Sequence, residues 1–140
     1  MRVVNVIGSG GFDQELDLYK LAGDDSMPNA RYEPEHHHGM YLQFGEDAPL
    51  ITVYRTGKYI IRAGSFDELE ETRDDLLALF AELGIDEVED SFGVRNVVCT
   101  DDLGRDVNLN ALSVELGLEE VEYEPEQFPG LIYRTEDGVI

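Results

Sequence analysis

The tetrapeptide Tyr-Glu-Pro-Glu at residues 32–35 recurs at residues 123–126, and this repetition decides the architecture of the 140-residue chain. The same offset of 91 residues aligns residues 5–43 with residues 96–134 without a gap, and nine of the aligned pairs are identical. A fixed period of self-similarity indicates a duplicated structural unit. The sequence therefore predicts a tandem repeat.

The second copy is shorter than the first. It runs over residues 96–140 and holds no counterpart of residues 50–95. We therefore expect a first repeat over residues 1–92 and a partial second repeat over residues 93–140. The missing hairpin would leave a sheet edge unpaired, and such an edge favours pairing with another chain. We expect the chain either to form a homodimer by edge-strand pairing or to derive from a longer parent protein.

Local patterns predict strands, one short helix and one long helix in the first repeat. Ser65 and Glu68 have the spacing of a capping box at the start of the long helix, and Gly84 suits the left-handed position after its end. Gly57 supplies the positive φ of a hairpin turn. The predicted strands are residues 3–9, 30–32, 39–44, 50–54 and 58–62, and the short helix is residues 15–22.

The second copy repeats the opening of the first. A strand is predicted over residues 95–100, a helix over residues 106–116 before Gly117, and further strands over residues 119–123 and 128–134. The fold class is therefore α+β, with an antiparallel sheet and helices on one face. The opposite face is left uncovered, and a partly apolar uncovered face usually marks a binding surface.

Acidic residues dominate the composition. Asp and Glu number 31 and Lys and Arg number 10, so the formal net charge is −21, while 42% of residues are hydrophobic. This apolar fraction is that of a globular protein rather than a disordered acidic tail. Carboxylates spread along a chain with few lysines suit a salt-rich cytoplasm, where the Debye length falls to about 3 Å at 1 M. An ordinary acidic protein with a solvated surface is the alternative, and the charge by itself disfavours nucleic acid as a partner.

Several other chemistries are disfavoured. No apolar run approaches a membrane span and the N-terminal residues lack a signal-peptide core, so we expect a cytoplasmic protein. Cys99 alone allows no internal disulfide. Consecutive histidines at residues 36–38 would alternate across a strand, so we expect no metal site and no cofactor. Residues 8–11 lack the ending of a phosphate loop and are interpreted as a strand–helix turn. No nucleophile–base constellation is present, so we expect no enzyme activity.

Longer motifs resemble one protein family. They are Tyr-Glu-Pro-Glu-Gln-Phe-Pro-Gly-Leu-Ile-Tyr-Arg at residues 123–134, Arg-Thr-Gly-Lys at 55–58, Leu-Asp-Leu at 16–18 and the Asn-Val-Val strand start at Asn96. Together they resemble the TATA-box-binding protein family, particularly its archaeal members. The resemblance implies a saddle with pseudo-two-fold symmetry, whose concave sheet binds the minor groove of A·T-rich promoter DNA. The convex helices would bind other transcription factors.

The resemblance also implies which residues lie on the floor of the groove. The family's central asparagines match Asn5 and Asn96. Their groove-facing neighbours match Ile7 and Val98. A threonine near the floor of the groove matches Arg62, which is a departure from the family pattern.

The resemblance assigns the wedges that unstack base steps. In the first repeat they match His37 and Tyr54, so neither is phenylalanine. In the second repeat one wedge matches Phe128, which is followed by Pro129, and the other position has no counterpart. Because stacking a base on an aromatic ring contributes about 1–3 kcal/mol, these departures are expected to weaken DNA bending.

Charged residues complete the candidate site. The candidates for phosphate contacts are Arg55, Lys58, Arg62 and Arg105, and two of them, Arg55 and Lys58, flank the hairpin that carries Tyr54. The resemblance implies that Glu124 and Glu126 lie where transcription factor B docks through basic residues.

Two functional hypotheses follow. The first is a nucleoid-associated general factor that bends promoter DNA and recruits transcription factor B for archaeal transcription initiation. The second is a shortened paralogue with weak or no DNA binding that modulates transcription through protein–protein contacts; a saddle module borrowed by another assembly is a third reading. Under the first hypothesis, the acidic side chains are expected on the convex and peripheral surface, and DNA binding should need high salt.

Overall fold

The computed structural model describes residues 1–117 and 119–140, and it forms two compact units, Met1–Asp101 and Asp102–Ile140. The unit boundary lies beyond the start of the second repeat, because the first strand of that repeat pairs within the first unit. The repeat boundary at residues 92 and 93 concerns the sequence and stays a prediction.

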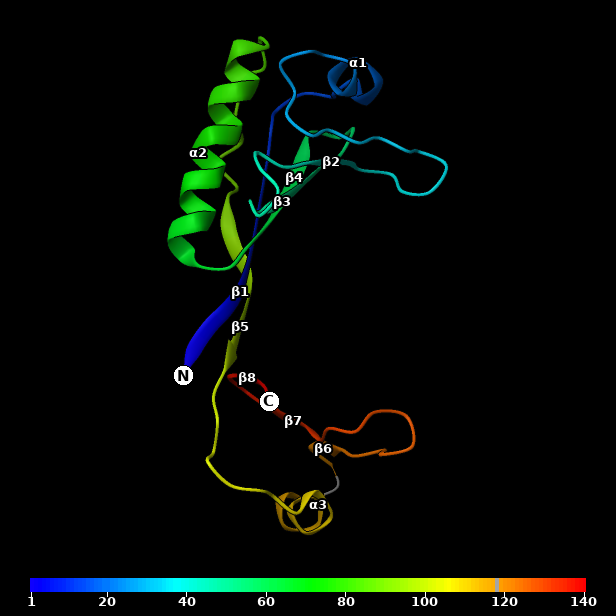
Figure 1. The fold of residues 1–140 in the computed structure, drawn as a ribbon, viewed down its shortest axis with the longest axis vertical. Helices are drawn as coiled ribbons and strands as arrows, with labels where there is room; N and C mark the ends of the chain where they lie inside the picture. Colours follow the sequence, from blue (N-terminus) through cyan, green and yellow to red (C-terminus); the bar gives the residue numbers. More distant parts are fainter. Residues whose placement is uncertain (118) are drawn as a thin grey trace. The chain divides into compact units, whose positions relative to one another are not determined.

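The first unit is built on a five-stranded antiparallel sheet with strand order β2-β3-β4-β1-β5 (Figure 1). Residues 30–32 do not form the predicted strand: Arg31 makes a single bridge to Tyr41. The reason lies in the turn that follows, where the amides of His36 and His37 both donate to the Glu33 carbonyl. The strands are β1 (Arg2–Gly11), β2 (Met40–Leu42), β3 (Leu50–Val53), β4 (Lys58–Ala63) and β5 (Gly93–Thr100).

The glycine-rich residues 8–11 belong to β1, so the prediction of a strand–helix turn there is wrong. Large side chains occupy the space that a Cβ atom would need. A Cβ on Gly10 would lie 2.5 Å from the Tyr59 hydroxyl oxygen, and one on Gly8 would lie 2.9 Å from a Leu69 methyl carbon. These glycines let the strand continue beneath bulky neighbours.

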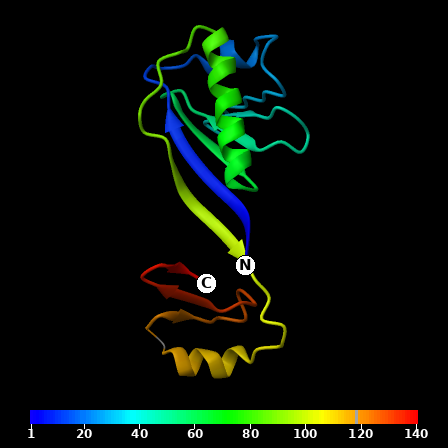
Figure 2. The same cartoon turned by 90° about the vertical axis from the view of Figure 1, so that its left-hand side faces the viewer.

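One face of the sheet is covered by α2 (Phe66–Glu82), which packs on β4 and β1 (Figure 2). The predicted helix start is confirmed, since the Glu68 amide donates to Ser65 Oγ at 3.2 Å. The Glu68 carboxylate accepts from the Gly64 amide at 2.9 Å, one residue before the position that a capping box predicts. Gly84 has φ +84°, as the predicted left-handed turn requires.

Aromatic rings fill the centre of the first unit. Phe12 and Phe80 stack with their centroids 4.7 Å apart, and Phe12 also contacts Tyr59. The buried Tyr59 hydroxyl accepts a hydrogen bond from Arg73 Nε at 3.2 Å, so its polar atom is satisfied. Leu18 and Leu21 bring the short helix α1 (Leu18–Ala22) into the same core.

Within residues 102–117 and 119–140, the second unit contains one helix and a three-stranded sheet. The predicted helix 106–116 begins later, at Leu109, because Asn108 caps it. The predicted strand 128–134 likewise begins at Ile132, because the Phe128 amide belongs to a turn closed by the Glu124 carbonyl. The elements are α3 (Leu109–Leu116), β6 (Val121–Glu122), β7 (Ile132–Thr135) and β8 (Gly138–Val139), and the strand order is β6-β7-β8.

Hydrogen bonds recur at the offset of the sequence repeat. Asp17 caps α1 by accepting from the Lys20 amide at 3.2 Å, and Asn108 caps α3 by accepting from the Ala111 amide at 3.1 Å. The turn closed by the Glu33 carbonyl in the first repeat corresponds, at the same offset, to the turn closed by the Glu124 carbonyl in the second. The duplication therefore shows in backbone contacts as well as in residue identities.

Replacing Gly57 with Ala should destabilise the chain strongly. Gly57 has φ +94°, and a Cβ there would lie 2.3 Å from the Phe12 carbonyl oxygen and 2.5 Å from that of Gln14. We expect a loss of more than about 3 kcal/mol in the free energy of unfolding, because backbone strain alone costs about 1–3 kcal/mol. Urea unfolding in concentrated KCl measures it.

Gly84→Ala is the matched control for this prediction. Gly84 also has a positive φ, but a Cβ there meets nothing within 4 Å. Its substitution should cost only the backbone strain. Equal losses for the two variants would contradict the steric explanation.

Candidate nucleic-acid interface

The strand register lines up a row of side chains across the face opposite α2. Ile7 of β1 lies between Asn96 of β5 and Arg62 of β4, and Arg62 in turn lies opposite Leu50 of β3. Neighbouring residues such as Val6 point to the helix-covered side, since side chains alternate along a strand. This face, which we call the open face, thus combines apolar, amide and cationic groups at its centre.

A second row lies beside the first. It joins Ser9, Ile60, Thr52 and Tyr41 across β1, β4, β3 and β2. Tyr54 comes directly after β3, two residues beyond Thr52. Its amide donates to the Lys58 carbonyl at 2.8 Å.

The pairing of β1 with β5 places the repeat symmetry on the open face. Val6 pairs with Val97, its own counterpart at the offset of 91 residues. Asn5 pairs with Val98, and Ile7 pairs with Asn96, so each residue faces the counterpart of the other. The local pseudo-two-fold axis passes between the two valines. The four floor residues assigned by resemblance are therefore gathered around one point.

An aromatic cluster stands at the β2–β3 end of the open face. The His37 ring stacks on Tyr41 with centroids 4.8 Å apart and 22° between planes, and its centroid is 6.3 Å from that of Tyr54. The Gly39 amide lies 3.0 Å from His37 Nδ1, and the Gly39 carbonyl oxygen lies 3.3 Å from the same nitrogen, so the backbone of Gly39 holds the ring in place. Arg31 lies over the Tyr41 ring at 5.4 Å. Both first-repeat wedge candidates thus belong to one aromatic cluster, in which His37 stacks on Tyr41 and is tilted relative to Tyr54.

Sequence reasoning missed Tyr41, Gly39 and Arg31 as parts of this group. Strand alternation places Tyr41 on the same face as Thr52, but it does not show that a loop residue reaches the ring. The sequence did indicate that Gly39 matters, because Gly39 and Gly130 are one of the identical pairs of the repeat. A Cβ on Gly39 would lie 2.5 Å from a Thr52 methyl carbon and 3.1 Å from the His37 ring.

Arg95 is a further cation that sequence reasoning missed. A register shift between Ile7 and Gly8 leaves Arg95 outside the ladder, so it is bulged. Its Nε donates to Ser9 Oγ at 2.8 Å and its Nη2 donates to the Ser91 carbonyl at 2.7 Å. These bonds hold the guanidinium beside the second row of the open face.

Charge is divided sharply within the first unit. Strands β1 to β5 contain no Asp or Glu, although the chain has 31 of them, whereas α2 carries seven carboxylates and one arginine. Lys58 and Arg62 are exposed and have no ion-pair partner within residues 1–117 and 119–140. Arg55 differs, because it lies 3.9 Å from the Glu15 carboxylate at the hairpin turn.

The remaining candidates belong to the second unit and are described within it. Phe128 is 54% exposed, and its ring lies over Gly130, where a Cβ would be 2.7 Å from Cε1. Pro129, Glu124 and Glu126 are exposed on the same turn.

Other groups that the sequence singled out show no ligand-binding arrangement. His36 and His38 are exposed, and Cys99 is exposed on β5. Among the described residues, no three His, Cys, Asp or Glu side chains gather closely enough to hold a metal ion. None of the helices in that part of the chain has the length and apolarity to span a membrane.

A sheet face without carboxylates, in a strongly acidic chain, suits an anionic ligand, and this defines the class of protein to look for. Comparison with known proteins agrees with this class. The family model described as transcription factor TFIID (or TATA-binding protein, TBP) matches residues 1–83 and 91–139. The chain belongs to this family, whose members are DNA-binding transcription factors and not enzymes.

Individual relatives point the same way. The chain is 49% identical to TATA-box-binding protein C of Halobacterium salinarum over an alignment of 140 positions that covers 98% of this chain and 77% of that protein. It is 40% identical to a TATA-box-binding protein of Natronomonas pharaonis, over 98% of this chain and 73% of that protein. The solved structure of Methanococcus jannaschii TBP matches with a TM-score of 0.76 and 34% identity, covering 97% of this chain and 77% of that one. These similarities confirm the predicted α+β fold and the resemblance to archaeal proteins.

Replacing Gly39 with Ala should separate the rings of the aromatic cluster. The new methyl group would meet Thr52, His37 and Tyr54 within 3.2 Å, so the rings must move. We expect the ring-current shift of the His37 Hε1 proton, measured by NMR, to fall by at least half. Gly45→Ala is the control, because a Cβ there meets only the Ala48 Cβ at 3.9 Å. An unchanged shift in the Gly39 variant would contradict the stacked geometry.

Proposed function

We propose that the chain binds the minor groove of A·T-rich double-stranded promoter DNA through the open face and recruits transcription factor B to start archaeal transcription. The observation that carries the proposal is the row Asn96–Ile7–Arg62–Leu50 on a sheet whose strands hold no carboxylate. Membership of the family supports the same function. Association with the nucleoid follows from DNA binding.

The centre of the open face suits the chemistry of an A·T-rich groove. A·T and T·A pairs present only acceptors there, at adenine N3 and thymine O2. The side-chain amides of Asn5 and Asn96 supply donors on either side of the pseudo-two-fold axis, and Ile7 and Val98 supply apolar contacts. Val98 is 40% exposed, so it is available to a ligand. Asparagine beside aliphatic side chains therefore favours A·T over G·C, whose guanine amino group would meet the apolar residues.

Arg62 extends this readout by electrostatics. It lies between Ile7 and Leu50, and no ion pair within the described residues neutralises it. Narrow A·T-rich minor grooves have enhanced negative potential, which attracts inserted arginine. A cation at this position thus favours the same sequences as the asparagines.

The aromatic groups supply the stacking surfaces. Tyr54, His37 and Tyr41 form a preassembled platform in the first repeat, and Phe128 is the wedge of the second. Stacking against a base contributes about 1–3 kcal/mol. Because His37 already stacks on Tyr41, ordering these rings on DNA costs little further entropy.

Phosphate contacts come from the cations around the open face. Lys58 and Arg55 lie at the β3–β4 turn next to Tyr54, and Arg95 lies by β5. Such contacts fix the position of a protein on the duplex without reading its sequence.

Transcription factor B is proposed to dock on the second unit. Glu124 and Glu126 are exposed on its turn, where two carboxylates offer partners to basic side chains. In concentrated salt this attraction is short-ranged, so docking depends on close pairing rather than long-range steering.

A mobility-shift and bending assay on a TATA duplex, from about 0.2 M to multimolar KCl, tests the function. Counterion release normally weakens binding as salt rises. Here the seven carboxylates of α2 and the net charge of −21 repel DNA, and salt screens that repulsion. We expect affinity to rise over the lower part of the range, and added transcription factor B to shift the complex further.

Tyr54→Ala should weaken this binding by about 5- to 150-fold, the equivalent of about 1–3 kcal/mol of stacking. Tyr19→Ala is the control, since Tyr19 is an exposed tyrosine on α1 outside the open face. Equal affinities for the two variants would contradict the stacking role. Absence of binding at every salt concentration would favour the alternative, a shortened paralogue acting through protein contacts.

The free edge of β5 is proposed to pair with a second copy of the chain. Within the described residues β5 pairs with β1 alone, and Val94 and Val97 are 43% and 38% exposed. Sedimentation velocity should show a concentration-dependent dimer, and Val94→Lys should shift it toward monomer because an edge lysine opposes strand addition. Val114→Lys on α3 is the control. A monodisperse monomer whose β5 amides resist hydrogen exchange would contradict edge pairing.

A further inference from the structure

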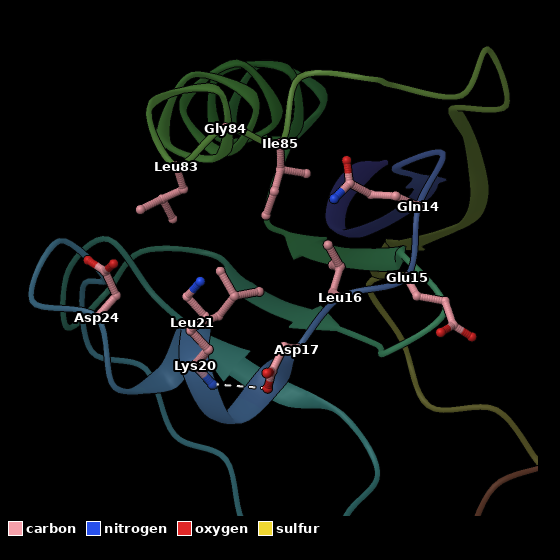
Figure 3. Close-up of a pocket in the computed structure, with 10 residues that line it drawn as sticks. All are labelled: Gln14, Glu15, Leu16, Asp17, Lys20, Leu21, Asp24, Leu83, Gly84 and Ile85. Atoms are coloured by element: carbon pink, nitrogen blue, oxygen red, sulfur yellow. Dashed lines mark hydrogen bonds between the residues drawn. The ribbon is translucent and has the colours of Figure 1, made fainter.

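A cavity of about 310 Å³ lies between α1 and the C-terminal end of α2. Figure 3 shows Leu83 and Ile85 pointing from the end of α2 toward Leu16 and Leu21. Leu16, Leu21 and Ile85 are almost fully buried and Leu83 is half-buried, so these aliphatic side chains line the interior of the hollow.

Backbone contacts hold both walls in place. The Ile85 amide donates to the Phe80 carbonyl at 2.8 Å, which turns the chain back against the helix end after Gly84. On the other side, the Leu16 amide donates to the Arg55 carbonyl at 2.8 Å. These bonds fix the backbone on both sides of the cavity.

The rim of the cavity is acidic. Glu15, Asp17 and Asp24 line it, and Lys20 is the one cation among its lining residues. Hydrogen bonds from the amide and hydroxyl of Ser26, helped by the charge of Lys20, hold the pKa of Asp24 below its ordinary value. These interactions therefore favour the charged form of Asp24.

We propose that this cavity docks a segment of a partner protein that presents an aliphatic side chain flanked by lysine or arginine. The aliphatic lining takes the apolar group, and the carboxylates of Asp17 and Asp24 face the flanking cations. Charge complementarity selects this occupant, because a rim of three carboxylates repels nucleic acid and acidic peptides. None of the residues assigned to the open face lines the cavity, so the proposal does not depend on DNA binding.

The volume fits such a segment. Small-molecule sites usually measure about 300–1,000 Å³, so this cavity is at the lower end of that range. It accommodates the side chain of a short linear segment rather than a folded surface. The partner is thus expected to bring the segment on a tail or loop.

A peptide-display experiment tests the proposal with the full chain. Random 12-residue peptides are panned at the lowest salt at which the chain stays folded. We expect enriched peptides to carry an aliphatic residue with at least two neighbouring basic residues. Their affinity is then measured by fluorescence anisotropy against Asp17→Asn/Asp24→Asn, and we expect it to fall at least tenfold.

The substitutions are chosen to preserve the fold. Asparagine keeps the oxygen that accepts from the Lys20 and Ser26 amides, and Asn108 caps α3 in the equivalent position to Asp17. The matched control is Asp74→Asn/Asp75→Asn, which removes the same charge from an exposed part of α2. Panning that enriches no basic–aliphatic pattern, or peptides that bind the two double variants equally, would overturn the proposal.

Discussion

The antiparallel pairing of β1 with β5 is the constraint on which the open face depends. The two strands are copies of one another, and their register places Val6 opposite Val97, so that each of the flanking pairs joins an asparagine to an aliphatic residue. A slip by one residue would turn every side chain of one strand to the other face. The register therefore places one asparagine on each side of the central valine pair, and the register shift after Ile7 leaves Arg95 outside the ladder and beside Ser9.

The same sheet explains how an acidic chain can present a surface for an anionic ligand. The helix-side residues of β2, β3 and β4 are buried, and an unpaired carboxylate is costly there because it would lose its hydration. The acidic side chains of the first unit lie instead on the solvent face of α2 and in loops. A net charge of −21 is thus a sum over the molecule and does not describe the potential at the sheet. At the ionic strengths that such a surface suits, screening confines each charge to its neighbours.

The sequence predicted the features that are determined locally. Ser65 and Gly84 bound α2 because capping depends on adjacent backbone groups, and Gly57 turns the hairpin for the same reason. Prediction failed where a distant side chain decides the outcome. Gly8 and Gly10 signalled a turn, but Leu69 and Tyr59 fill the space beside them and keep β1 extended. Placement of His37 on Tyr41 likewise depends on a loop closing over a strand, which no spacing reveals.

The two repeats build their candidate wedge positions with one backbone geometry and then differ in chemistry. The amides of His37 and Phe128 each donate to a glutamate carbonyl at 3.0 Å, and each ring lies over a glycine two residues later. Histidine in one repeat and phenylalanine in the other therefore share a backbone geometry but differ in ring chemistry: His37 Nδ1 contacts the Gly39 backbone, and the His37 ring stacks on Tyr41. A symmetric protein would read an A·T-rich groove equally in both directions, because the groove pattern is degenerate. A polar aromatic platform in one repeat and a hydrophobic ring in the other remove that equivalence, so the asymmetry between repeats gives the proposed complex a direction.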